Sequence, residues 1–247
     1  MSDSIIIIPT YKDKENIEKI IRKVFSLPKE FHLLIIDDNS PDGTADIVKG
    51  LMQEFPDKLF LEERAGKLGL GTAYIHGFKW ALSHQYEYVF EMDADFSHNP
   101  DDLVRLYEAC HTDKADMSIG SRYCKGGGVK NWPKKRIFIS RYGSVYTRFI
   151  TGMKVHDTTA GFVCYTRRVL EAIDFSQIRH IGYGFQIEMK FTVWKLGFRI
   201  QEVPIIFTDR TEGVSKMSGG IFKEAIFGVI KMKLHSWRNK PTRKQAK

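Results

Sequence analysis

Two carboxylates separated by one residue, Asp93 and Asp95, follow a short apolar run over residues 88–90. That run is typical of a buried strand, in which side chains two residues apart point to the same side. Neighbouring carboxylates repel each other unless a cation or a shared proton lies between them. Mg²⁺ and Mn²⁺ prefer oxygen ligands and often connect carboxylates to substrate phosphates. The pair therefore indicates a site for a metal-bound diphosphate, with a solvated turn before Asn99 as the alternative.

The composition is that of one large globular domain that binds anions. The chain has 247 residues, 43% hydrophobic and 28% charged, and a formal net charge of +8. The charge favours phosphates, nucleic acid or an acidic membrane surface as partners. Three scattered cysteines, Cys110, Cys124 and Cys164, indicate reduced thiols in a cytosolic compartment. We expect no signal peptide and no membrane-spanning helix, because no apolar run approaches about 18 residues.

Apolar runs alternate with helical patterns along the first half of the chain. The run Ile5–Ile8 is continuous and β-branched, as in a strand buried on both faces of a parallel sheet. Further strands are expected at 33–36, 59–61, 88–90 and 117–119, with helices at 17–24, 44–51, 69–82 and 101–110. This order predicts an α/β fold with a mostly parallel central sheet flanked by helices. After it we expect a basic loop at 126–136, a strand at 159–165, a helix at 185–196, an extended segment at 198–207 and a polar loop at 208–216.

Polar residues end several of these strands. Pro9, Tyr11, Asp38, Arg64 and the pair that follows residue 90 all stand at carboxyl ends. Ligands of such sheets bind at that edge, so we expect these side chains to meet in one site.

Longer segments in the same order resemble one enzyme family. They are Ile8–Tyr11 with Glu15–Ile17, Ile36–Thr44, Arg64–Tyr74, Met92–Pro100, Gly120–Tyr123, Trp132 with Arg136, Ser140 and Arg141, Asp157–Phe162, Gly182–Met189, and Asp209-Arg210 with Ser215-Lys216. The chain resembles the inverting glycosyltransferases of family 2, with a Rossmann-like GT-A fold, and among them the polyprenol-phosphate (dolichol-phosphate) mannose synthases. One departure is Lys12-Asp13, where the family commonly has Asn-Glu, and it concerns base or ribose contacts.

The resemblance implies a reaction and its cofactor. Mannose would pass from GDP-mannose to the phosphate of dolichol or another polyprenyl phosphate, with inversion. Mg²⁺ or Mn²⁺ would be held by Asp93 and Asp95, with Ser97 as a weaker ligand or a loop cap. A phosphate acceptor is already anionic, so it needs a cationic cradle and no general base. Arg122, Arg136 and Ser140 match the positions of that cradle.

The resemblance also implies roles for the remaining site residues. The group expected to act in catalysis is Asp95, Arg122, Arg136 and Arg210. Substrate contacts are expected from Pro9, Tyr11, Glu15, Asp38, Asp42, Arg64, Lys67, Gly69, Asp93, Ala94, Ser140, Gln186, Glu188 and Lys216. Of these, Asp38 and Glu15 would contact the nucleoside. Glu188 has helix packing as an equal alternative.

Residues 1–217 are expected to form the catalytic domain, and 218–247 an amphipathic helix with a basic tail and no transmembrane segment. Ile226, Val229, Ile230, Leu234 and Trp237 form a helical stripe in that tail, with many cations around it. The tail could lie in an anionic membrane surface, or pack on the domain and leave its cations solvated. We expect a protein on the cytoplasmic face of a membrane, bound directly or through an anchoring partner.

Three other functions compete with this hypothesis. A UDP-glucose-dependent polyprenyl-phosphate glucosyltransferase, or another family 2 enzyme, would share the motifs. The turn Gly69-x-Gly71 could suggest a dinucleotide-binding oxidoreductase, but Tyr74 stands where the third glycine belongs and the turn follows the third strand. Only the net charge suggests nucleic acid, and we expect no such partner.

Overall fold

The computed structural model describes residues 2–182, 184–209 and 228–236. Its strands are β1 (Ser4–Thr10), β2 (His32–Asp37), β3 (Leu59–Glu63), β4 (Tyr88–Glu91), β5 (Met117–Ser121), β6 (Gly128–Lys130), β7 (Val163–Thr166), β8 (Ile200–Pro204) and β9 (Ile206–Thr208). Its α-helices are α1 (Ile17–Phe25), α2 (Thr44–Glu54), α3 (Leu70–Ser83), α4 (Asp102–His111), α5 (Lys134–Thr151), α6 (Arg167–Ala172), α7 (Gly184–Lys195) and a segment at 228–236.

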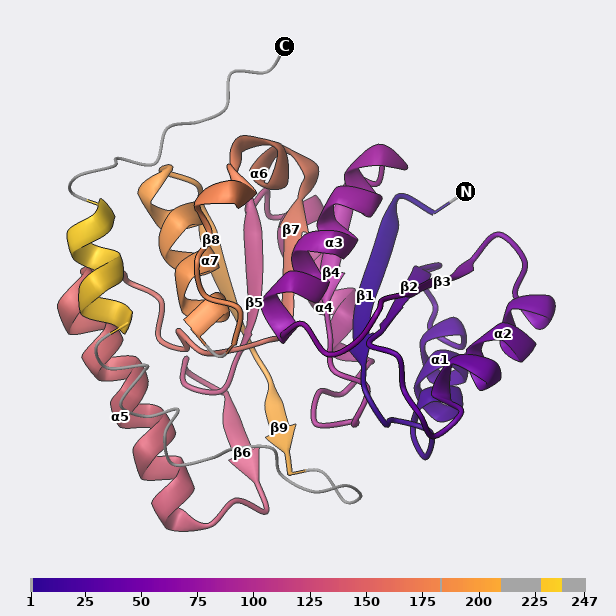
Figure 1. Cartoon of the computed structure of the whole chain (residues 1–247). Helices are drawn as coiled ribbons and strands as arrows, with labels where there is room; N and C mark the ends of the chain where they lie inside the picture. Colours follow the sequence, from indigo (N-terminus) through magenta and orange to yellow (C-terminus); the bar gives the residue numbers. More distant parts are fainter. Residues whose placement is uncertain (1, 183, 210–227, 237–247) are drawn as a thin grey trace.

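The described strands form a large sheet with helices on both faces (Figure 1). The order is β3-β2-β1-β4-β7-β5-β8, and β6 pairs with β9 in a second, two-stranded sheet. Every pairing is parallel except those of β7, which runs antiparallel to both β4 and β5. The expected α/β fold with a mostly parallel sheet is therefore confirmed.

Strand β1 shows why the sheet is central. Ile5 and Ile7 pack on one face, in the cluster that includes α3, α6 and α7. Ile6 and Ile8 pack on the other face, against α1, α2 and α4. All four side chains are fully buried, and each contributes about 1.5–3 kcal/mol through loss of apolar contact with water. A strand covered by helices on both faces needs apolar side chains at every position, which explains why polar and apolar residues do not alternate in this run.

The second half differs from the sequence-based expectation in two places. The expected basic loop at 126–136 contains β6 and the first turn of α5, because β6 is paired to β9 from about 80 residues later. The expected strand at 159–165 is shorter and later, at Val163–Thr166, and it inserts antiparallel between two parallel strands.

The helix at 228–236 packs on the domain. Val229 and Met232 are buried in a cluster with Met153, Ile187 and Phe191. The Lys233 ammonium donates to the Thr151 carbonyl at the end of α5, 2.8 Å away. Part of the expected stripe is therefore packed on the domain, whereas Ile230 and Leu234 are 38% and 52% exposed. Ile226 and Trp237 lie outside the described residues. Among the described helices, none combines the length and apolar character needed to cross a membrane.

Candidate active site

A buried ion pair stands at the carboxyl ends of β2 and β3. The Arg64 guanidinium donates to the Asp38 carboxylate at 2.5 and 2.6 Å, and both side chains are about nine-tenths buried. Arg64 also donates to the Thr72 hydroxyl at 2.7 Å. The pair therefore links the second strand, the third strand and the first turn of α3, as the motif positions predicted. An arginine that crosses between strands in this way holds the ends of both strands rigidly together.

Other residues expected to bind the donor lie in the neighbouring strand and turns. Pro9 lies in β1 beside β2, and the Lys67 ammonium stands 4.9 Å from the centre of the Tyr11 ring. Asp42 accepts hydrogen bonds from the backbone amides of Lys14 and Thr44. These contacts order the turns that the donor would touch.

Glu15 was also expected to contact the nucleoside. It is exposed on the turn that precedes α1, and no hydrogen bond joins it to the described residues. Its expected contact stays a prediction.

A close backbone contact joins the turn that begins α3 to the segment before α7. The Gly71 amide donates to the Ile181 carbonyl at 2.8 Å. Gly69 has φ +101°, and a Cβ there would stand 3.0 Å from the same carbonyl. A Cβ on Gly71 would stand 2.7 Å from the Phe185 ring. The two glycines therefore allow the segment before α7 to lie directly on the turn that begins α3.

The two carboxylates of the metal motif follow β4. The strand ends at Glu91, so Asp93 and Asp95 lie in the loop beyond it, both half-buried, with Ala94 buried between them. The Ser97 amide donates to one Asp95 oxygen at 3.0 Å. Ser97 itself is almost fully buried, and its carbonyl accepts a hydrogen bond from the Thr208 amide of β9. The loop is thus ordered by its own backbone and by the second sheet.

A histidine packs beneath this loop. The His98 ring stacks on Phe162 with a centroid distance of 4.8 Å and contacts Phe207 edge-on. Burial lowers its pKa to about 4, although the nearby Asp95 charge opposes this change. His98 is therefore neutral at physiological pH and a weak base, which suits a structural role.

Arg122 is held by a buried carboxylate. The Asp157 side chain, fully buried, accepts from Arg122 Nε at 2.7 Å, from Nη2 at 2.6 Å and from its backbone amide at 3.0 Å. Burial acts to raise the pKa of Asp157, but the arginine outweighs it and holds the pKa below its usual value. Nη2 also donates to Thr159, whereas Nη1 makes no hydrogen bond within the described part of the chain. The guanidinium is fixed with one edge left for a ligand.

A second guanidinium lies nearby, on α5. Arg136 donates to Asp209 at 2.7 Å, and its guanidinium carbon stands 3.9 Å from the centre of the Trp132 ring. The Arg122 guanidinium is 5.5 Å from the same ring. The Trp132 indole N–H is buried and has no hydrogen-bond partner among the residues described. The Trp132 ring therefore lies beside both guanidinium groups, and its unpaired N–H is a further donor for an anion bound there.

Ser140, the third expected member of this cradle, follows Arg136 by one helical turn. Its hydroxyl accepts a hydrogen bond from the Tyr123 hydroxyl at 2.7 Å. The structure thus brings all three expected cradle residues to one end of α5.

A network that the sequence did not reveal lies under the site. Gln186 donates to Glu91 at 2.7 Å, and the Lys190 ammonium donates to the Ala160 carbonyl at 2.6 Å and to Gln186. Both charged groups are fully buried. Burial raises the pKa of Glu91 to about 7 and lowers that of Lys190 to about 8, with each charge partly opposing the change in the other. The network ties the end of β4 to the loop that carries Asp157.

One sequence signal could have found Lys190. It follows Gln186 by four residues in an expected helix, so the two share a face that points into the core. The second missed residue is Glu202, which accepts from the Ser121 hydroxyl at 2.6 Å and from the Asp157 amide at 3.0 Å. Both residues support the loop around Arg122.

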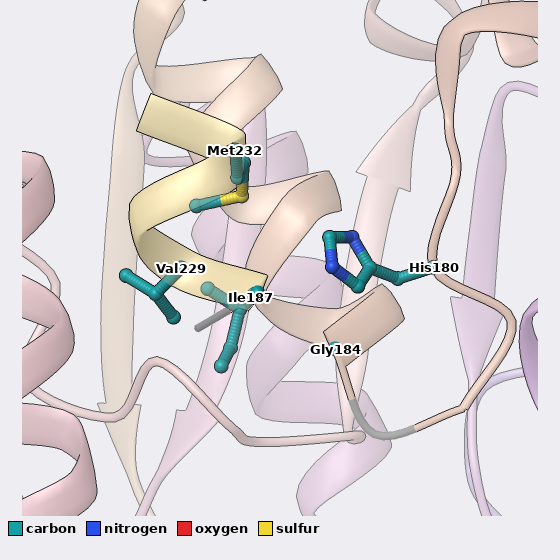
Figure 2. Close-up of a pocket in the computed structure, with 6 residues that line it drawn as sticks. His180, Gly184, Ile187, Val229 and Met232 are labelled. Atoms are coloured by element: carbon teal, nitrogen blue, oxygen red, sulfur yellow. The ribbon is translucent and has the colours of Figure 1, made fainter. Parts of the chain in front are cut away.

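Glu188 shows the packing alternative. Its carboxylate accepts from the backbone amides of Arg179 and His180 and contacts the His180 ring nitrogen at 2.9 Å. Figure 2 shows this ring beside a small pocket between α7 and the helix at 228–236. Ile187, Val229 and Met232 make the rest of that pocket apolar. Glu188 therefore orders the segment before α7 that contacts Gly69 and Gly71, and a sugar contact stays a prediction. The expected residues Arg210 and Lys216 lie outside the described residues.

Comparisons with known proteins decide the family. The model of glycosyl transferase family 2 matches residues 5–174. The chain belongs to glycosyltransferase family 2. This glycosyltransferase is 45% identical over 226 residues to a polyprenol monophosphomannose synthase of Mycolicibacterium smegmatis, covering 92% of this chain and 85% of the relative. It is 46% identical over 225 residues to an undecaprenyl-phosphate mannosyltransferase of Micrococcus luteus, covering 91% of each.

A solved structure supports the fold of this glycosyltransferase. A mannosyltransferase from Pyrobaculum calidifontis, in complex with GDP-Man and Mn²⁺, aligns with a TM-score of 0.60 and 16% identity. The alignment covers 98% of this chain and 66% of that chain. The expected GT-A fold is therefore confirmed, as are the expected resemblance and the enzyme class.

Proposed function

We propose that this family 2 glycosyltransferase transfers mannose from GDP-mannose to the phosphate of a polyprenyl phosphate, with inversion. The observation that supports a phosphate acceptor is that the guanidinium groups of Arg122 and Arg136 both lie against Trp132, 5.5 and 3.9 Å from the centre of its ring. Each arginine is oriented by its own carboxylate, so the pair is arranged before a substrate arrives. The two relatives that are about 45% identical bear names of polyprenyl-phosphate mannose synthesis, which supports the same assignment.

The reaction needs no general base in this proposal. An oxygen of the acceptor phosphate, already anionic, attacks the anomeric carbon of mannose and forms the new C–O bond. The bond from that carbon to the GDP oxygen breaks, and its electron pair leaves with the diphosphate. Arg122 and Arg136 orient the attacking phosphate. His98, a weak base with a pKa of about 4, is not required.

A divalent cation fits the carboxylates after β4. Asp93 and Asp95 offer oxygen ligands on one short loop, and the Ser97 hydroxyl is the further expected ligand. Within the described residues, no three His, Cys, Asp or Glu side chains form a metal site. In this proposal, substrate phosphates complete the Mg²⁺ or Mn²⁺ site. When bound, the cation would neutralise charge on the departing diphosphate.

The donor is proposed to lie over the Asp38–Arg64 pair, with Asp42, Lys67 and Tyr11 around it. Arg210 and Lys216 would act on the donor phosphates from the segment outside the described residues. We propose that the enzyme works at the cytoplasmic face of a membrane. Its acceptor is a lipid, and its three cysteines are free thiols, as is usual in a reducing compartment.

A transfer assay tests the proposal directly. GDP-mannose and UDP-glucose are each incubated with a short-chain, water-soluble prenyl phosphate, with Mg²⁺, with Mn²⁺ or with a chelator. We expect transfer from GDP-mannose that the chelator abolishes, and Asp95→Asn to lose both transfer and cation-dependent donor binding. Transfer from neither donor would exclude this function, and a preference for UDP-glucose would assign the alternative donor.

The acceptor cradle is tested by one matched pair of variants. Arg136→Ala should raise the KM for the prenyl phosphate about tenfold or more, because a charge-assisted contact is lost, while the KM for GDP-mannose changes little. Arg199→Ala removes an exposed arginine elsewhere and should change neither. Equal increases for both substrates would contradict the assignment of Arg136.

A further inference from the structure

Helix α5 exposes a continuous apolar stripe. Phe138, Tyr142, Val145 and Phe149 are 68%, 62%, 51% and 86% exposed. Their spacing of four, three and four residues places them within about 60° of the helix circumference. Phe138 and Tyr142 also stack on each other at the surface, with ring centroids 5.9 Å apart. Single exposed apolar residues are ordinary, whereas a contiguous row of aromatic side chains indicates a surface that docks on something.

The charges of α5 identify the kind of partner. Its sequence, KKRIFISRYGSVYTRFIT, contains five cations and no acidic residue. Lys134, Lys135 and Arg141 are exposed and, by helical geometry, flank the stripe within about 60° on either side. Basic residues beside an aromatic and aliphatic row are the pattern of a helix that lies in the interface of an anionic bilayer. An acidic lipid surface complements both the charges and the apolar row.

The opposite face of the same helix carries the proposed acceptor cradle. Ser144 and Thr147 are buried against the domain. Arg136 and Ser140 point to that side and bond to Asp209 and Tyr123. A lipid phosphate at the membrane surface is therefore separated from the cradle by about one helix diameter, 10–12 Å. The helix at 228–236 is a weaker candidate, because it uses Val229 for packing.

We propose that α5 is the surface by which this enzyme docks on an anionic bilayer, with its axis in the membrane plane and Phe138 and Phe149 inserted at the lipid interface. The proposal rests on the proposed function in that a lipid acceptor explains why a membrane lies beside this helix. It assigns the docking to α5, which the sequence had left to the segment at 218–247.

Vesicle flotation of the full chain tests the surface. Vesicles of phosphatidylcholine with phosphatidylglycerol are compared with vesicles of phosphatidylcholine alone. Wild type should float with the anionic vesicles, and added salt should weaken that binding. Phe138→Ser with Phe149→Ser should raise the lipid concentration for half-maximal flotation by about tenfold or more, because two aromatic side chains no longer leave water. Leu234→Ser, 52% exposed on the helix at 228–236, is the matched control and should leave it unchanged.

A second variant removes charge without touching the stripe. Lys135→Glu with Arg141→Glu should also abolish the preference for anionic vesicles. Both variants change exposed residues, so their urea unfolding midpoints should match wild type. The proposal would be overturned if the serine variant and the glutamate variant both floated like wild type. It would also be overturned if Leu234→Ser alone lost flotation. A wild-type dimer that becomes monomeric in the Phe138→Ser, Phe149→Ser variant, with flotation unchanged, would instead assign the stripe to a second copy and overturn it.

The assay with the water-soluble prenyl phosphate separates this proposal from the proposed function. The serine variants should keep wild-type transfer to that acceptor and lose transfer to acceptor embedded in vesicles. Flotation through α5 by a protein that transfers no mannose would reject the proposed function and leave the docking surface in place.

Discussion

The buried pair of Asp157 and Arg122 allows a prediction whose size follows from burial. Asp157→Asn keeps the shape of the side chain but removes the charge that compensates Arg122. The pair is 0% and 9% exposed, and the carboxylate accepts three hydrogen bonds from one arginine. Removing one partner of a buried pair costs about 3–5 kcal/mol, because a buried charge is left unpaired. We expect the free energy of unfolding, measured by urea denaturation at pH 7, to fall by that amount.

Asp209→Asn is the matched control for this change. It breaks the same kind of pair, with Arg136, but those side chains are 31% and 28% exposed. Solvent screens a pair of that exposure, so a loss below about 1 kcal/mol is expected. Equal losses in the two variants would refute the argument from burial. Asp157→Asn should also raise the KM for the prenyl phosphate more than that for GDP-mannose.

The pH dependence of this loss has a defined sign. The pKa of Asp157 is lower in the folded protein than its ordinary value of 3.8. Its contribution to stability is therefore complete above that value and is lost as the pH falls through the lower, folded pKa. The deficit of Asp157→Asn should be full at pH 7 and shrink below about pH 3.8. A deficit that grows as the solution is acidified would contradict the charge pair as its cause.

Two further predictions concern groups that the donor and acceptor need not touch. Gly71→Ala should destabilise the protein by about 1–3 kcal/mol in thermal denaturation, because the added Cβ would stand 2.7 Å from the Phe185 ring. Gly50→Ala is the control: no atom lies within 4 Å of its added Cβ, so this variant should be as stable as wild type or slightly more stable. A milder effect at Gly71 than at Gly50 would contradict the packing. For the buried network, the raised pKa of Glu91, about 7, means that its contribution to stability is present below its ordinary pKa of 4.5 and is lost as the pH rises through 7. Between pH 5 and pH 7.5, the free energy of unfolding of the wild type should therefore fall by about 2 kcal/mol relative to that of the double variant Glu91→Gln, Lys190→Met, as measured by urea denaturation. A difference that stays constant over this pH range would show that the pair does not titrate in it.

Much of the first half was predictable because its information is local. The run Ile5–Ile8 has no polar face, so it could only be a strand covered on both sides, and the alternation with helices required parallel neighbours. The site at the carboxyl ends of those strands followed from the same topology. Asp38 and Arg64 meet there because β2 and β3 are adjacent and parallel.

The second half was less predictable because its elements depend on distant partners. β6 is three residues long and is stabilised by β9, so nothing local distinguishes it from the loop that was expected. β7 enters the sheet antiparallel, between β4 and β5, and sequence order alone does not show such an insertion. Short strands take their stability from the neighbours they pair with, which lie far along the chain.

The sequence alone determined the family and the α/β order of the chain, and it predicted which residues hold a cation, a nucleotide and a phosphate. It could do so because the apolar runs that indicate buried strands, and the spacing of the motifs, are local features of the sequence. The tertiary structure decided which charges are paired and which faces are covered. Asp157 compensates Arg122 from 35 residues away, Lys190 is buried under the site, and α5 turns Arg136 inward and its aromatic stripe outward. Such outcomes depend on the dielectric and the neighbours that only the folded chain provides.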